Sequence, residues 1–119
     1  MDNLDAAQAF YSRVLGLELD SRDAERHVFF RCGGAMFLLF NPKQTMQPGG
    51  IVPPHGAEGA GHVAFAVAAG ELPAWRERLR EHGVEIEAEV MWPSGGQSLY
   101  VRDPARNSVE LTTPAIWNL

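Results

Sequence analysis

Two side chains that could bind a metal ion, His62 and Glu110, each lie in a segment with the alternation of a β-strand. In GHVAFAV, residues 61–67, His62 shares a strand face with two alanines, whose small size leaves the space that a pocket wall needs. A neutral imidazole and a carboxylate are suitable ligands for Zn, Fe, Mn or Ni. If the sheet curls, both side chains point into one concavity, and the pair is predicted to bind a divalent metal.

The segment SLYVRDPARNSVEL, residues 98–111, predicts a hairpin with two different faces. One face of its first strand carries Ser98, Tyr100 and Arg102, and the other carries Leu99 and Val101. The polar face would bring Tyr100 close to His62 and Glu110, so Tyr100 and Glu110 are the predicted catalytic residues. For His62 and Glu110, the structural alternative is a solvated sheet face or a buried hydrogen-bonded pair. For Tyr100, the alternative is a place in the core or in the pocket wall.

Apolar side chains that could contact a small molecule occur in the first half of the chain and in one loop. Phe30, Leu38 and Phe40 have the same parity in a predicted hairpin, which favours a shared apolar wall. Trp92 lies in the loop MWPSGGQS, where a large ring is hard to bury. With Tyr100, these four are the predicted substrate-binding residues, and ordinary core packing is the alternative.

The elements that must position these residues form two similar halves. The first is predicted to hold a helix at 4–15, capped by Asp5, and strands at 17–21, 26–32 and 35–41; the second holds a strand at 61–68, a helix at 70–83 and strands at 84–90, 97–102 and 108–113. Residues 43–60, rich in Pro and Gly, predict an irregular linker. The second half is a complete βαβββ unit, and the first lacks only its opening strand. The repeat predicts an α+β fold in one domain over residues 1–119, with modules at about 1–42 and 61–114.

The composition is that of an acidic chain. Ten basic and fifteen acidic residues give a net charge of −5, which argues against nucleic acid or an anionic membrane as a partner. No apolar run approaches the roughly 20 residues that span a bilayer, and the start has no signal-peptide pattern. The single cysteine, Cys32, cannot form an internal disulfide. These features predict a soluble cytoplasmic protein.

Three segments resemble the vicinal oxygen chelate superfamily, which includes glyoxalase I, extradiol dioxygenases, fosfomycin-resistance enzymes and bleomycin-binding proteins. They are AQAFYSRVLGLEL, GHVAFAV and SLYVRDPARNSVEL, and the resemblance is most specific in the first and in the pattern D-P-x-x-N-x-x-E of the last. The resemblance implies two βαβββ modules that form a cup. It also implies that His62 and Glu110 bind a divalent ion and that Tyr100 contacts the substrate.

The sequence departs from the metal-using members at the ligands expected from the first module. Those members carry a further histidine on the first strand of that module, and none precedes His27 here. By repeat alignment, Leu38 stands at the position that matches Glu110. Three protein ligands are usual at a catalytic metal site. The third ligand therefore lies upstream of Met1, or comes from a second chain, or the site binds no metal.

These alternatives lead to different functions. The first is a metal-dependent lyase or dioxygenase, in which the ion acts as a Lewis acid on a small molecule. The second is a metal-free small-molecule (drug) binding or resistance protein, whose apolar cup holds its ligand unchanged. The third is a domain with a vestigial pocket. The missing strand and ligand also predict a homodimer, since a two-fold interface lets each chain complete the cup of the other.

Overall fold

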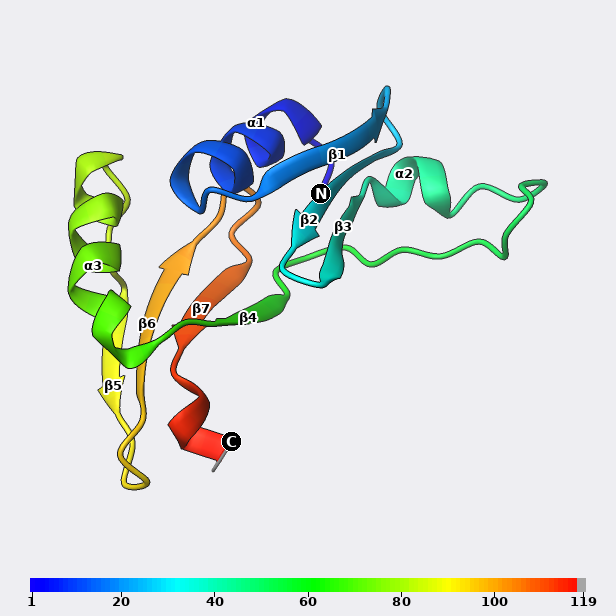
Figure 1. Ribbon diagram of the computed structural model, residues 1–119. Coiled ribbons are helices and arrows are strands. Elements are labelled where there is room, and N and C mark those ends of the chain that lie inside the picture. Colours follow the sequence, from blue (N-terminus) through cyan, green and yellow to red (C-terminus); the bar gives the residue numbers. More distant parts are fainter. Residues whose placement is uncertain (118–119) are drawn as a thin grey trace. The chain divides into compact units, whose positions relative to one another are not determined.

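The chain forms two groups of elements, Met1–Gly59 and Ala60–Leu119, each with its own sheet (Figure 1). The computed structural model describes residues 1–117. Each unit combines helices with a β-sheet, so the predicted α+β fold is confirmed. In the described part of the chain, no helix is both long enough and apolar enough to cross a membrane. The cytoplasmic location and the organisation as one domain stay predictions.

The first unit contains a three-stranded antiparallel sheet with the order β1-β2-β3. Its elements are α1 (Leu4–Ala9), a π-helical turn (Phe10–Val14), β1 (Glu18–Asp23), β2 (His27–Cys32), β3 (Ala35–Phe40) and α2 (Pro42–Thr45). Its sheet has one strand fewer than that of the second unit, as the repeat predicted. The prediction that residues 43–60 form an irregular linker is wrong at its start. There Asn41 caps α2 and Pro42 occupies the first turn.

The N-terminal cap of α1 is Asn3, so the predicted cap at Asp5 is wrong. The Asn3 side chain accepts a hydrogen bond from the Ala6 backbone N–H at 3.0 Å. A cap must precede the first helical residue, and Asp5 lies within the first turn, where its charge still favours the helix dipole. The helix ends as predicted at Gly16, whose φ of +76° is easily adopted by glycine.

The hairpin of β2 and β3 places aromatic side chains on both faces of the first sheet. Its two-residue turn pairs Cys32 with Ala35, so Phe30 pairs with Phe37 and not with Leu38. Paired residues share a sheet face, and a two-residue turn therefore inverts the numerical parity between the strands. The prediction that Phe30 shares a face with Leu38 and Phe40 is wrong for this reason.

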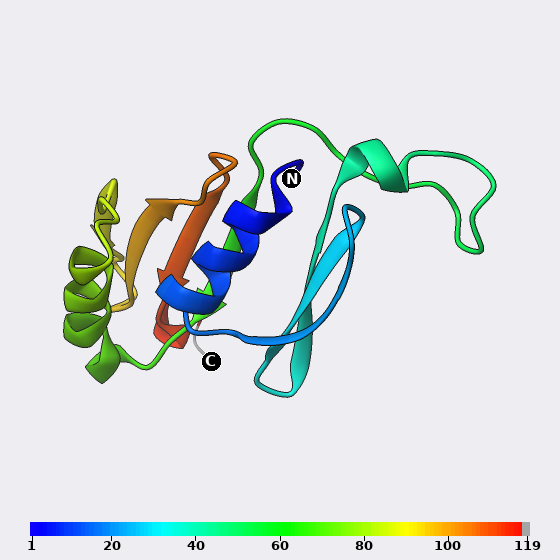
Figure 2. The same cartoon turned by 90° about the horizontal axis from the view of Figure 1, so that it is seen from above.

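The face that carries Phe30 is the core of the first unit. Phe30 is fully buried, and the ring of Tyr11 lies 6.0 Å from the Phe30 ring and 5.0 Å from that of Phe37. The helical segment 4–14 thus covers this face of the sheet (Figure 2). Phe30 has no exposed surface with which to contact a ligand.

The second unit contains a four-stranded sheet with the order β4-β7-β6-β5, in which β4 runs parallel to β7. Its elements are β4 (His62–Ala66), a 3₁₀ turn (Ala69–Glu71), α3 (Leu72–Glu81), β5 (Ala88–Met91), β6 (Gln97–Arg102), β7 (Ser108–Thr112) and a 3₁₀ turn (Pro114–Trp117). The helix α3 runs alongside β5 (Figures 1 and 2). The predicted strand at 84–90 is wrong over residues 84–87, which precede β5.

The two faces of the second sheet differ in the way that the alternation predicts. One face carries Val63, Phe65, Leu99, Val101, Val109 and Leu111. On the other face, Glu110 lies between Ala64 of β4 and Tyr100 of β6. His62 follows the parity of Ala64, so the predicted common face of His62, Tyr100 and Glu110 is confirmed.

Candidate functional site

His62 and Glu110 meet on the polar face of the second sheet. The parallel pairing of β4 with β7 places His62 opposite Ser108, two residues before Glu110. The His62 Nε2 atom lies 3.1 Å from Glu110 Oε1. The two side chains differ in accessibility, since that of His62 is 53% exposed and that of Glu110 only 8%. A buried carboxylate thus presents one oxygen to an accessible imidazole.

The second oxygen of Glu110 accepts a hydrogen bond from Ser98. Ser98 is 1% exposed, and its hydroxyl donates to Glu110 Oε2 at 2.6 Å. This distance is typical of a charge-assisted O–H···O⁻ bond. Ser98 Oγ also lies 2.9 Å from Thr112 Oγ1. The sequence indicated that Ser98 shares a strand face with Tyr100. It did not indicate the hydrogen bond from Ser98 to Glu110, because that bond depends on the strand register.

Tyr100 lies beside Glu110 on the neighbouring strand. Burial raises the pKa of its phenol above the usual 10.0, and a hydrogen bond to Glu110 acts in the same direction. Its ring centroid is 6.3 Å from that of His62. The phenol therefore stays protonated at neutral pH and can donate a hydrogen bond at this site.

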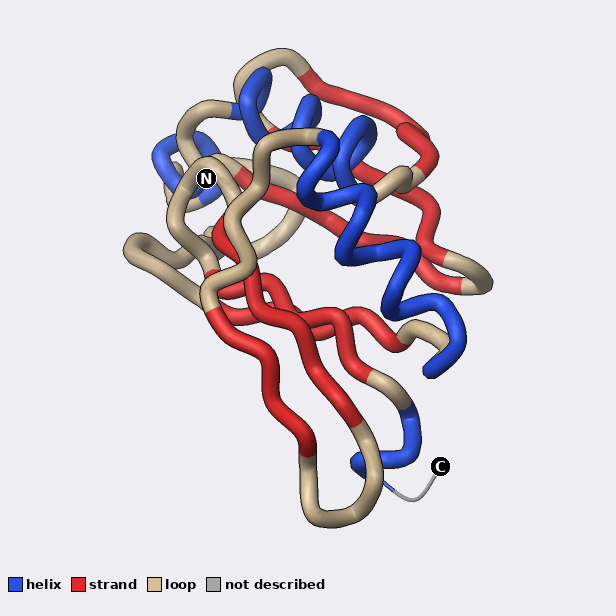
Figure 3. The backbone as a smooth tube through the Cα atoms, turned by 90° about the vertical axis from the view of Figure 1, so that its left-hand side faces the viewer, coloured by secondary structure: helices blue, strands red, loops and turns tan. Residues whose placement is uncertain are grey.

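Trp92 reaches the same cluster from the turn between β5 and β6, which closes the long hairpin at the bottom of Figure 3. Its indole Nε1–H donates to Ser98 Oγ at 2.9 Å, while the residue remains 37% exposed. The structure thus brings together four predicted site residues within the second unit: His62, Trp92, Tyr100 and Glu110.

The donor set of this cluster fits part of a divalent metal site. Two ligand atoms of a tetrahedral zinc ion, each about 2.1 Å from it, lie about 3.4 Å apart. His62 Nε2 and Glu110 Oε1 have nearly this separation. Over residues 1–117, however, no group of three His, Cys, Asp or Glu side chains is placed to hold a metal ion. The chain therefore offers two suitable ligands at this position, and a third must come from elsewhere if a metal binds.

The other predicted contact residues lie on the first unit. We call His27, Phe29, Leu38 and Phe40 the aromatic face, because they lie on the side of the sheet opposite Phe30. The His27 ring stacks on Phe29 with centroids 4.0 Å apart, and Phe40 packs edge-on against Phe29 at 5.5 Å. Leu38 is 44% exposed. This face offers aromatic and apolar surface of the kind that holds planar ligands.

His27 makes the stability of the first unit dependent on pH. Burial lowers the pKa of its imidazole below 6.5, and the Arg26 guanidinium, 2.6 Å from His27 Nδ1, acts in the same direction, whereas Asp23 opposes it. Below pH 6.5 the unfolded chain binds a proton that the folded chain resists. The neutral His27 side chain therefore contributes to the free energy of unfolding above pH 6.5. This contribution is lost as the pH falls through the lower pKa that His27 has in the folded protein.

We expect the urea midpoint of the protein to fall between pH 7.5 and pH 5.5, and to fall less in His27→Gln. An unchanged pH dependence in His27→Gln would contradict the assignment.

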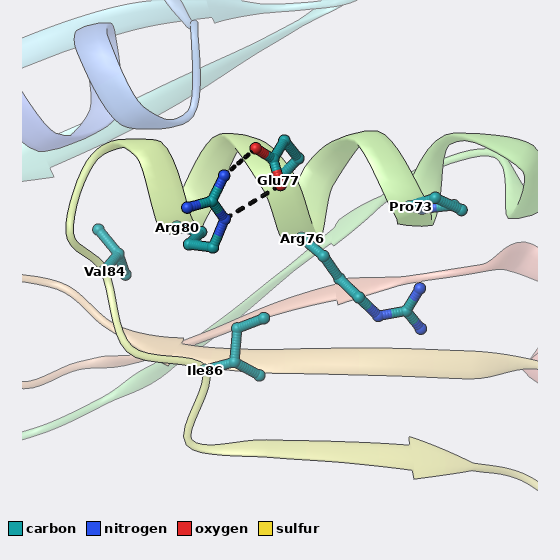
Figure 4. A pocket seen from close by; sticks show the side chains of 6 residues that line it. All are labelled: Pro73, Arg76, Glu77, Arg80, Val84 and Ile86. Carbon is teal, nitrogen blue, oxygen red and sulfur yellow. Dashed lines mark hydrogen bonds and ion pairs between the residues drawn. The ribbon is translucent and has the colours of Figure 1, made fainter.

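A groove of about 340 Å³ lies between α3 and the segment before β5 (Figure 4). It is lined by Pro73, Arg76, Glu77, Arg80, Val84 and Ile86. Arg80 pairs with Glu77, and Arg76 pairs with Glu89 at 2.7 Å. None of the predicted site residues lines this groove, and its two arginines are already paired with carboxylates.

Comparisons with known proteins agree with this architecture. The family model described as Glyoxalase/Bleomycin resistance protein/Dioxygenase superfamily matches residues 1–111. The solved structure of lactoylglutathione lyase from Agrobacterium tumefaciens is 40% identical, with a TM-score of 0.95, over 99% of this chain and 90% of that one. A glyoxalase/bleomycin resistance protein/dioxygenase from Nocardioides is 25% identical, with a TM-score of 0.74, over 95% of this chain and 77% of that one. The metallothiol transferase FosB of Shouchella clausii is 29% identical over 115 residues, which are 95% of this chain and 74% of the relative.

Proposed function

Because the chain belongs to the Glyoxalase/Bleomycin resistance protein/Dioxygenase superfamily, we propose that it is a metal-dependent enzyme that acts on a small molecule. The observation that supports this most directly is the 3.1 Å approach of His62 Nε2 to Glu110 Oε1. The similar proteins named lactoylglutathione lyase and metallothiol transferase favour a small thiol, or a compound made from one, as substrate. A dioxygenase reaction stays a prediction.

In this proposal His62 and Glu110 hold a divalent ion such as Zn, Fe, Mn or Ni. When bound, the ion would supply Lewis-acid polarisation of a substrate oxygen. Tyr100 holds its proton at the phenol oxygen, because burial and Glu110 both raise its pKa. Its proton bonds to Glu110, so its phenol oxygen would accept a hydrogen bond from the substrate. Glu110 is kept in place by Ser98, so its Oε1 remains directed to His62.

We further propose a homodimer in which the partner supplies the third ligand. His62 is half exposed, so a residue of a second copy can approach the pair. Three protein ligands are usual at a catalytic site, and a two-fold interface would provide the same third ligand to both copies. Light scattering of the metal-loaded protein should give the mass of a dimer. A monomer that holds one ion per chain would contradict this proposal.

A metal-free binding protein is the second candidate, and the aromatic face supports it. Leu38 and Phe40 would contact an apolar or planar ligand there, and Trp92 would contribute exposed ring surface on its own unit. No third ligand joins His62 and Glu110 within the residues that the structure describes. In this function the ligand leaves chemically unchanged.

Metal content separates the two candidates. We expect protein incubated with Zn²⁺, Mn²⁺, Ni²⁺ or Fe²⁺ under reducing conditions, and then desalted, to retain one ion per chain of at least one metal by elemental analysis. The loaded protein should convert glutathione and a 2-oxoaldehyde into the corresponding 2-hydroxyacyl thioester, which the gain of thioester absorbance would report. Protein that retains none of the four ions, yet binds an apolar fluorescent probe, would favour the second candidate.

A further inference from the structure

We propose that Ser98 and Trp92 are positioning residues for Glu110, through which the β5–β6 turn directs the carboxylate toward a metal ion. The inference rests on the proposed metal site. It concerns a chain of three hydrogen-bonded groups, in which Trp92 Nε1 lies 2.9 Å from Ser98 Oγ and Ser98 Oγ lies 2.6 Å from Glu110 Oε2. Neither residue is a suitable metal ligand, so both would act through Glu110.

The chemistry of Trp92 and Glu110 favours one direction for the Ser98 proton. An indole N–H can only donate, and an ionised carboxylate can only accept. Ser98 has a single hydroxyl proton, which must therefore point to Glu110 while its oxygen accepts from Trp92. The Thr112 hydroxyl lies 2.9 Å from Ser98 Oγ and belongs to the same buried group. Bonds arranged donor to acceptor in this way polarise and strengthen one another.

This arrangement assigns a different task to each oxygen of Glu110. Oε2 accepts from the Ser98 hydroxyl and Oε1 faces His62, while the Tyr100 phenol also forms a hydrogen bond to the carboxylate. A carboxylate anchored at one oxygen cannot rotate freely, so it is prepared to bind an ion through Oε1 alone. Groups that orient a metal ligand in this manner typically change metal affinity by about 10-fold to 100-fold when they are removed.

Trp92 connects this anchor to the surface because it lies in a well-defined turn. Its backbone N–H donates to Gly96 O at 2.8 Å, and its carbonyl accepts from Gly95 N at 2.9 Å. Gly95 has a φ of +97°, which a side chain would make unfavourable. The turn thus holds the indole N–H over Ser98 while 37% of Trp92 stays exposed.

Cobalt binding to the protein tests the inference. We expect Co²⁺, titrated alone and followed by its visible absorption, to bind Ser98→Ala about 10-fold to 100-fold more weakly than wild type. The absorption spectrum should also change, because a released carboxylate can bind through both oxygens. Trp92→Phe, which loses only the N–H donor, should weaken binding by about threefold to tenfold, as expected for one neutral hydrogen bond.

Two matched variants control for the loss of a hydroxyl and of an indole. Ser94→Ala removes an exposed serine of the same turn, and Trp75→Phe alters a tryptophan of α3. Both should bind Co²⁺ like the wild type. Thermal unfolding in EDTA measures the stability of each variant without metal, so that affinity and folding are compared separately.

The outcomes distinguish a positioning role from a packing role. Wild-type Co²⁺ affinity and spectrum in Ser98→Ala would overturn the inference, even if the metal-free variant were less stable. If Ser98→Ala does not fold, the Co²⁺ affinity of Trp92→Phe becomes the test. A wild-type Co²⁺ affinity in Trp92→Phe would then overturn the inference. A wild-type protein and controls that bind no Co²⁺ would instead overturn the proposed metal site together with it.

Discussion

Glu110→Ala is expected to abolish stoichiometric metal binding. The carboxylate provides one of the two suitable ligand atoms that meet at this position, and no group of three such side chains occurs over residues 1–117. Removing a group that merely orients a ligand costs about 10-fold to 100-fold in affinity, so loss of the ligand itself should cost about 100-fold or more. Elemental analysis after desalting, and titration with Co²⁺ or Zn²⁺, would measure the loss.

Two further variants separate ligand loss from loss of charge. Glu110→Gln keeps the shape of the side chain and retains a neutral oxygen, so it should bind metal weakly. Glu89→Ala removes an exposed carboxylate from β5 of the same sheet, and should retain one ion per chain. Urea unfolding without metal would verify that each variant folds. Full metal retention in folded Glu110→Ala would rule out the assignment of Glu110 as a ligand.

Asp103→Ala is expected to lower the free energy of unfolding by about 3 kcal/mol. Asp103 is 2% exposed and lies in the turn between β6 and β7. Its Oδ1 accepts from the backbone N–H groups of Ala105 and Asn107, both at 2.9 Å, and its Oδ2 accepts from Asn107 Nδ2 at 3.0 Å. Asn107 Oδ1 in turn accepts from the Gly61 N–H at 2.6 Å, so the turn also fixes the start of β4.

Asp103→Asn gives the matched control for this turn. One amide oxygen can still accept from both backbone N–H groups, so the expected loss is about 1 kcal/mol. Glu87→Gln weakens the exposed ion pair of Glu87 with Arg102 on the same sheet, and should change stability by less than about 1 kcal/mol. Chemical denaturation would measure all three. A loss below about 1 kcal/mol in Asp103→Ala would show that the turn does not depend on these bonds.

The sequence by itself determined the two-module α+β architecture and the polar face of the second sheet. The strand period of two places His62 with Ala64, and Tyr100 on the face opposite Leu99, whatever the neighbouring strands are. The D-P-x-x-N segment predicted the turn that joins β6 to β7. These features depend on local geometry, which a single chain segment carries in its own residues.

The tertiary structure decided how these faces meet. The prediction placed Phe30 on the wrong sheet face, because a two-residue turn exchanges even-numbered and odd-numbered positions between the two strands of a hairpin. The register shows that Phe30 pairs with Phe37. The parallel pairing of β4 with β7, strands far apart in the sequence, brought His62 to Glu110. The burial of Ser98 and its bond to Glu110 likewise depend on which strands pair, because a hydrogen bond between strands requires a register that no local pattern encodes.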